Sequence, residues 1–276
     1  MIRSVVVALE RGAASEVALR CAVRVARWHD ARLLMLASVQ PEGPPGSERA
    51  EADLAFEDDA VLENDEPAPQ PAASVTDHPL VEAAATLCGR HRVAWRAEGC
   101  VGDPRRHLAR YVPRADVVTV SRHRARAARG ELPRHAFALL RASARVVLVT
   151  PETYQEPQVI LAPYDGSPPA ARALALAAET SVRADLPLSV ASVGSDGFTT
   201  AHLNEAKRYL AAYAARADFL SRSGDPVQQL TALTYELGAA LLVMGAYGRR
   251  PLQRFLGGSR TQRILQGCHG PVLAVR

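Results

Sequence analysis

Apolar runs and helix-like patterns alternate from the start of the chain. Ser4 to Leu9 is a continuous run rich in valine, as expected of a parallel strand that is covered on both faces. Apolar residues then recur at helical spacing from Val17 to Ala26, and Ser15 is the predicted N-cap of that helix. A second strand is predicted from Leu33 to Val39. Strands joined by amphipathic helices indicate an α/β protein.

The same order of elements restarts at Val159, so the chain contains one module twice. Ala18-Leu19-x2-Ala22 and Ala173-Leu174-x2-Ala177 are 155 residues apart, and later landmarks match as well: Val101-Gly-Asp-Pro104 with Ser223-Gly-Asp-Pro226, Asp116–Val120 with Ala240–Met244, and Arg145–Val149 with Gly270–Val275. We therefore predict two doubly wound, Rossmann-like domains, each a five-stranded, mostly parallel sheet with helices on both faces. The predicted domains are residues 1–150 and 158–276, with residues 151–157 as linker.

The two halves differ most at residues 41–78, which only the first half contains. This stretch is rich in proline, alanine and acids, and it has few large apolar residues. Such a composition cannot bury enough surface to offset the entropy of ordering. We interpret it as an acidic insertion that is solvated, folds over the basic remainder, or contacts a partner.

Two glycines follow the apolar run Leu241–Met244 and form the best candidate for a ligand-binding loop. They are Gly245 and Gly248. After nine intervening residues come Gly258 and Ser259, before a predicted helix. Glycine lets a backbone approach a ligand closely, and the first N–H groups of a helix point at an anion. Five arginines (249, 250, 254, 260 and 263) add positive charge. Turn geometry alone would also explain such glycines.

The spacing Gly245-x2-Gly248-x9-Gly258-Ser259 after a strand resembles the ATP-binding signature of the universal stress protein family. Neither G-x-x-x-x-G-K-[ST] nor G-x-G-x-x-G follows a strand here. The resemblance covers nearly the whole chain, as a tandem pair of domains. It implies that Asp165 and the backbone of Val193, which end the first two strands of the second half, hold the nucleoside of ATP.

The resemblance implies a nucleotide site in the second domain and a particular domain pairing. The expected ATP-binding residues are Ala162, Pro163, Asp165, Val193, Met244, Gly245, Gly248, Arg249, Gly258, Ser259, Arg260 and Thr261. Mg²⁺ would be a normal companion of the triphosphate. The fifth strands of paired domains join edge to edge in this family, which here means residues 146–149 with 272–275; a homodimer is left open. Gly258→Arg or Gly245→Val is expected to abolish binding without unfolding the domain.

The first half departs from the motif at every position. Ser121, Arg124, Arg134 and His135 stand where the second half has Gly245, Gly248, Gly258 and Ser259, and Glu10 stands where it has Asp165. Long arginine side chains occupy positions where the backbone must approach phosphate, and they resist positive φ. We therefore expect a degenerate domain, whose basic stretch at residues 122–135 is solvated, binds phosphate through side chains, or contacts the acidic insertion.

Charge and cysteines limit the partners and the compartment. Residues 40–79 hold eleven acids and one arginine, so the rest of the chain is strongly basic, which suits an anionic partner or simply a solvated surface. Aromatics are sparse and no nucleic-acid-binding pattern is present, so nucleic acid is not an expected partner. The four cysteines form no C-x-x-C pair, and no apolar segment reaches membrane-spanning length. A cytoplasmic protein that does not contact membranes is expected.

The sequence contains no recognisable catalytic constellation. It has no nucleophile elbow, paired carboxylates beside a base, or metal-ligand cluster, and His202 and His269 have no recognisable partner. A nucleotide-responsive stress regulator is therefore the preferred function. A slow ATPase and an AMP or cyclic AMP sensor using the same pocket are the alternatives. Asp165 alone could equally be an N-cap or an Asx-turn residue.

Overall fold

The computed structural model describes the chain except residues 10–11, 39–78, 101–103, 122–145, 239 and 247–259. The acidic insertion therefore lies outside the described residues. The first half contains β1 (Ser4–Leu9), α1 (Ala13–His29), β2 (Arg32–Ser38), α2 (Pro79–His91), β3 (Trp95–Cys100), α3 (Pro104–Tyr111), β4 (Val117–Ser121) and β5 (Val146–Thr150). The second contains β6 (Val159–Pro163), α5 (Pro168–Ala184), β7 (Leu188–Val193), α6 (Asp196–Leu210), β8 (Ala217–Arg222), α7 (Pro226–Glu236), β9 (Ala240–Gly245), α8 (Arg260–Gly267) and β10 (Val272–Val275).

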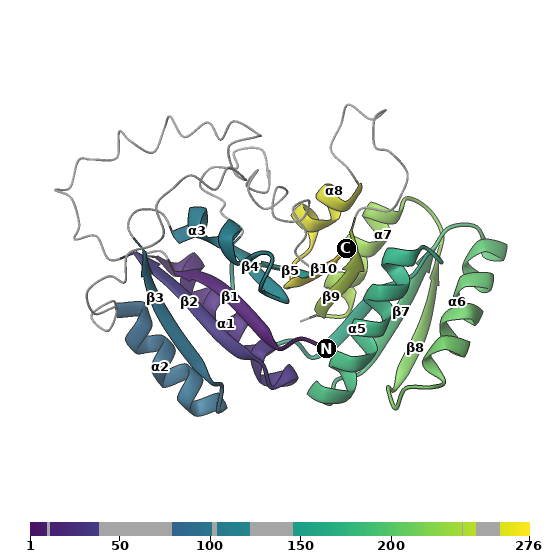
Figure 1. The fold of residues 1–276 in the computed structure, drawn as a ribbon. Coiled ribbons are helices and arrows are strands. Elements are labelled where there is room, and N and C mark those ends of the chain that lie inside the picture. Colours follow the sequence, from purple (N-terminus) through teal and green to yellow (C-terminus); the bar gives the residue numbers. More distant parts are fainter. Residues whose placement is uncertain (10–11, 39–78, 101–103, 122–145, 239, 247–259) are drawn as a thin grey trace.

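The ten strands of the described residues form one sheet, in the order β3-β2-β1-β4-β5-β10-β9-β6-β7-β8 (Figure 1). Each half contributes five parallel strands in the same order, outward from the centre of the sheet. The halves meet where β5 and β10 pair antiparallel, with Val149 opposite Val272 and Val146 opposite Val275. These are the two segments that the sequence analysis named for this edge, and their pairing leaves β3 and β8 as the outer strands.

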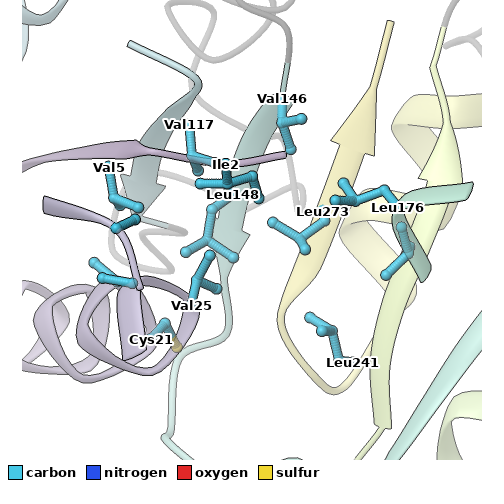
Figure 2. Close-up of a cluster of buried hydrophobic side chains, with 14 of the residues drawn as sticks. Ile2, Val5, Cys21, Val25, Val117, Val146, Leu148, Leu176, Leu241 and Leu273 are labelled. Atoms are coloured by element: carbon cyan, nitrogen blue, oxygen red, sulfur yellow. The ribbon is translucent and has the colours of Figure 1, made fainter. Parts of the chain in front are cut away.

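Helices cover both faces of the sheet, as the α/β fold class predicts. One apolar core lies between the sheet and helices α1, α2, α5 and α6, and the other between the sheet and α3, α7 and α8. Figure 2 shows Leu148 of β5 and Leu273 of β10 among side chains from both halves, including Val25 of α1 and Leu176 of α5. The first core is therefore continuous across the junction. Among the described helices, none combines the length and apolarity needed to cross a bilayer.

The two halves repeat even at the level of helix ends. Helices α1 and α5 both have 17 residues and end at left-handed aspartates, Asp30 with φ 52° and Asp185 with φ 53°. Their starts differ: Ser167 caps α5 by accepting a hydrogen bond from the N–H of Ala170, whereas α1 starts after Gly12 with no side-chain cap. The prediction that Ser15 caps α1 is therefore wrong. Ser15 lies inside the helix and is buried.

Two ion pairs, at positions related by the repeat, hold the linker against α1 and the amino terminus against α5. Arg24 of α1 binds Glu156 of the linker at 2.7 Å. Glu179 of α5 is 155 positions after Arg24, and Met1 is 155 positions before Glu156. The Met1 amine lies 3.6 Å from the Glu179 carboxylate. The repeat thus keeps the contact but reverses its charges. Such pairs fix geometry more than they add stability, because both are partly exposed.

A buried histidine links α1 to α5 across the junction. Thr180 Oγ1 donates to the carbonyl of Leu176 at 2.7 Å, so it must accept from Nε2 of His29, which lies 3.1 Å away. The neutral ring therefore carries its proton on Nε2 and leaves Nδ1 without a hydrogen bond, 3.8 Å from a Glu179 oxygen. Burial lowers the pKa of His29 to about 4, although the Glu179 carboxylate partly opposes this.

His29→Gln should reduce the acid sensitivity of the protein. The pKa of His29 is lower in the folded chain than the ordinary value near 6.5, so the unfolded state takes up the proton first as the pH falls. The contribution of neutral His29 to the free energy of unfolding is therefore complete above about pH 6.5. It is lost as the pH falls toward 4, and the loss amounts to at most about 3 kcal/mol. Glutamine can keep the donor to Thr180 without titrating. Urea unfolding at several pH values between 7 and 4 should show a shallower decline for His29→Gln than for the exposed control His269→Gln; equal slopes would contradict the assignment.

Candidate nucleotide-binding site

The carboxyl ends of β6, β7 and β9 meet at one edge of the second half. β6 pairs with β7 on one side and with β9 on the other, so the strand order reverses at β6. In doubly wound sheets a crevice for ligands forms at such a reversal. Six of the predicted residues lie on these strand ends or directly after them: Ala162, Pro163, Asp165, Val193, Met244 and Gly245.

Asp165 takes part in the turn between β6 and α5 and keeps one oxygen available. Its Oδ1 accepts a hydrogen bond from the N–H of Ser167 at 3.0 Å, which is the Asx-turn role considered for this residue. The carboxylate is exposed, and its second oxygen makes no hydrogen bond within the described part of the chain. The turn and a ligand can therefore use different oxygens of the same side chain.

Helix α5 starts at this edge but offers no free donors to an anion. Its first two residues, Pro168 and Pro169, have no N–H group. The next two donors are used by Ser167, whose hydroxyl binds the N–H of Ala170 and whose carbonyl binds that of Ala171. A phosphate at this edge must therefore obtain its donors elsewhere. The other described helices that start after a converging strand are α6, which follows β7, and α8, which follows β9.

Gly245 has a packing role that the sequence analysis missed. A Cβ at this position would lie 2.6 Å from the carbonyl carbon of Pro169 and 2.7 Å from the nitrogen of Ala170. The lack of a side chain thus lets β9 pack closely against the start of α5. This reason for a glycine differs from the one expected from the sequence, which is close approach of the backbone to a ligand. The expectation that Gly245→Val would leave the fold intact must therefore be corrected.

The residues of the predicted phosphate loop are only partly described. Gly248, Arg249, Gly258 and Ser259 lie outside the described residues, as do Glu10, Arg124, Arg134 and His135 of the first half. The first described residues beyond the loop are Arg260, which is exposed, and Thr261, which is half-buried, and they begin α8. Ser121 ends β4 opposite Thr150 of β5, as Gly245 ends β9 opposite Val275 of β10.

An aromatic cluster from α6 lies beside the same edge, and sequence reasoning did not identify it. His202 Nδ1 donates to the carbonyl of Phe198 at 2.7 Å, and the two rings lie 4.1 Å apart. The His202 ring leaves no space for a Cβ on Gly166, which has φ 72°. His202 therefore has partners, contrary to expectation. The only signal in the sequence is the four-residue spacing of Phe198 and His202.

Tyr164 connects this cluster to the core. It is buried, and its ring lies 6.3 Å from that of His202. Burial, together with a hydrogen bond to the Glu205 carboxylate, raises the pKa of Tyr164 to about 12. The phenol therefore stays protonated at neutral pH and acts as a donor that fixes α6 to the turn carrying Asp165.

Within the described ranges, no cluster of three or more histidine, cysteine, aspartate or glutamate side chains could hold a metal ion. The four cysteines are buried and form no disulfide bond with one another. Burial raises the pKa of Cys21 to about 12 and that of Cys88 to about 11, so both are thiols at neutral pH. The described edge thus offers hydrogen-bond acceptors and a helix terminus, which suit binding of a polar ligand.

Comparison with known proteins identifies the fold around this edge. The model of the universal stress protein family matches residues 157–276. The second half of the chain belongs to the universal stress protein family. A universal stress protein of Synechocystis, Slr1230, is 29% identical over 155 residues, which are 55% of this chain. The chain spans about half the length (54%) of that curated relative.

The whole chain also has a known fold. A universal stress protein from Archaeoglobus fulgidus superposes with a TM-score of 0.70 at 16% identity, covering 99% of this chain and 98% of that one. The likeness extends the universal stress protein fold over both halves. A shorter universal stress protein, solved in complex with cAMP, matches 43% of this chain and 97% of its own at 24% identity, with a TM-score of 0.39.

Gly245→Val should destabilise the universal stress protein domain whether or not nucleotide is present. The added side chain would collide with the start of α5, and overpacking of this kind costs about 1–3 kcal/mol. Gly197→Ala is the matched control, because a Cβ there meets nothing within 4 Å and lies in a helix. It should change the free energy of unfolding by no more than about 1 kcal/mol, in the stabilising direction. Urea unfolding without ligand measures both; an unchanged midpoint for Gly245→Val would contradict the packing role.

Proposed function

We propose that the second domain binds one ATP at the edge formed by β6, β7 and β9, and that the protein is a nucleotide-responsive stress regulator. The observation that carries the proposal is the convergence of an exposed carboxylate, the end of β7 and the start of the glycine loop at the point of strand reversal. An acceptor there suits ribose hydroxyls or an adenine amino group.

The proposed site has two parts with different chemistry. Asp165 and the backbone of Val193 hold the nucleoside, next to Ala162, Pro163 and Met244. Gly248, Gly258, Ser259 and the first turn of α8, with Arg249, Arg260 and Thr261, hold the triphosphate with or without Mg²⁺. Support for this division comes from α5, whose first donors are already satisfied, so that the triphosphate needs donors from another helix start. We assign that role to α8 and not to α6, because α8 directly follows the glycine loop.

We further propose that residues 1–150 form a degenerate copy of the same domain, which contributes shape but no nucleotide site. The shared strand order supports a common module, and the pairing of β5 with β10 supports a two-domain unit made by one chain. The substitutions by Arg124, Arg134 and His135 support the loss of the phosphate loop. We propose a cytoplasmic location for this unit, and a homodimer would have to form through surfaces other than the β5–β10 pair.

Calorimetric titration with ATP tests the stoichiometry. We expect about one site per chain, and loss of binding in Gly258→Arg with an unchanged free energy of unfolding, because the added side chain would occupy the place of phosphate. The control variant Ser121→Ala, at the strand end of the first half that corresponds to Gly245, should bind as the wild type does. Two equal sites, or undiminished binding by Gly258→Arg, would contradict the proposal. Competition with AMP and cAMP identifies the preferred nucleotide.

Asp165→Ala tests the nucleoside part separately. Loss of a charged acceptor should weaken ATP binding by roughly ten- to a hundredfold. Asp225→Ala is a close control, because Asp225, like Asp165, lies between a strand and a helix and accepts a backbone N–H through Oδ1. Its donor is the N–H of Gln228, at 3.0 Å, and this bond caps α7. Both variants should lose about 1 kcal/mol of stability, but only Asp165→Ala should lose affinity. Equal affinities would remove Asp165 from the site.

A further inference from the structure

A groove of about 520 Å³ lies in the first half, at the amino ends of its strands, whereas the proposed nucleotide edge lies at the carboxyl ends of the strands of the second half. It is formed where β1, β2 and β3 begin and where the chain leaves α3 toward β4. Its lining residues are Ser4, Val6, Arg32, Leu33, Leu34, Ala94, Trp95, Arg96, Tyr111, Arg114 and Ala115. This volume is in the range of small-molecule sites, about 300–1,000 Å³.

The floor of the groove is apolar. Val6 and Ala115 belong to the core on the α3 side of the sheet, and Leu34 and Tyr111 pack against it while remaining partly exposed. Helix α3 ends at Tyr111, so no further turn of this helix covers the starts of the strands. Trp95, which is 39% exposed, also borders the groove.

Three arginines surround this floor, and two have unengaged side chains. Arg32 and Arg114 are exposed, and within the described chain their guanidinium groups make no ion pair or hydrogen bond. Arg96 pairs with Glu98 at 2.6 Å, and Glu98 also accepts from the hydroxyl of Tyr111.

The other nearby carboxylate is also engaged in the fold. Asp116 Oδ2 accepts from the backbone N–H groups of Arg3 and Ser4, at 2.8 and 3.2 Å. Arg96 pairs with Glu98, whereas the neutral backbone donors satisfy Asp116 without cancelling its charge. Three arginines against two carboxylates leave an excess of one positive charge around the groove, and the guanidinium groups of Arg32 and Arg114 are the ones not already paired.

The second half shows that the fold does not need these arginines. Strand registers place Ser189 and Asp218 where the first half has Leu34 and Arg96. Counted from the prolines that start α3 and α7, Glu236 stands where the first half has Arg114, and it pairs with Arg222 at 2.9 Å. An apolar floor with cationic sides is therefore particular to the first half.

We propose that this groove binds a small amphipathic carboxylate, with its apolar body on Val6 and Leu34 and its carboxylate between Arg32 and Arg114. A guanidinium group presents two parallel N–H donors that match a carboxylate, which favours this headgroup. The first half would then have a ligand of its own, although it lacks the nucleotide loop. The site is independent of ATP binding in the second half.

Titration with octanoate and 3-phenylpropionate, followed by calorimetry and by the fluorescence of Trp95, tests the proposal on the full chain. Their amides, octanamide and 3-phenylpropionamide, keep the apolar body without the charge. At least one acid should bind saturably, and its amide should bind at least about tenfold more weakly, since hydrogen bonds to charged groups are the stronger ones. The double variant Arg32→Gln/Arg114→Gln should show a similar loss.

Arg90→Gln/Arg208→Gln removes the same charge from exposed positions on α2 and α6 and should bind the acid as the wild type does. Trp95→Phe should abolish the fluorescence change but retain the calorimetric signal. The proposal is overturned if neither acid binds saturably, if acid and amide bind equally, or if the two double variants bind alike. Saturating ATP should leave the titration unchanged; displacement of the acid by ATP would place both ligands in one site and also overturn it.

Discussion

The pairing of β5 with β10 is the interaction on which the architecture depends. Each half alone would expose an edge strand whose residues, Val146–Val149 or Val272–Val275, are apolar and buried in the whole chain. An exposed edge of this kind is a template for pairing with other chains. By pairing antiparallel, the two edges cover each other and place α1 beside α5, so that one apolar core crosses the junction (Figure 2). The buried His29–Thr180 hydrogen bond and the linker ion pair to Arg24 then fix how the helices meet.

Repetition of one module in a single chain allows the two copies to diverge in chemistry without losing the shared frame. The central helices have equal length and the same left-handed ends, and the strands have the same order. The copies differ where side chains reach the two ends of the sheet. The universal stress protein domain has an exposed aspartate and glycines at the carboxyl edge, whereas the first half has arginines and an apolar groove at the amino edge. Fold and site are thus determined by different residues.

Helix ends determine which polar groups one edge of the second domain leaves available to a ligand. The prolines and Ser167 at the start of α5 leave no donor free, and the turn uses only one oxygen of Asp165. The first turn of α5 therefore serves structure, and β9 can pack closely on it because Gly245 has no side chain. The aromatic cluster of Tyr164, Phe198 and His202 supports the same turn from α6.

The sequence by itself determined the series of strands and helices, the repeat, the family of the second half and the edge at which its site should lie. Those features follow from local periodicity and from motifs whose residues are close in the chain. Only the tertiary structure decided which atoms share a space: that Gly245 accommodates α5, that His29 meets Thr180 across 151 positions of sequence, and that Arg32, Arg96 and Arg114 surround one groove. It also showed that α1 starts after Gly12 and that Ser15 is not its N-cap. The position of a cap depends on backbone geometry that composition does not specify. Contacts between distant segments depend on the packing of whole elements, and hydrophobic periodicity fixes which face of an element is buried but not which neighbour it touches.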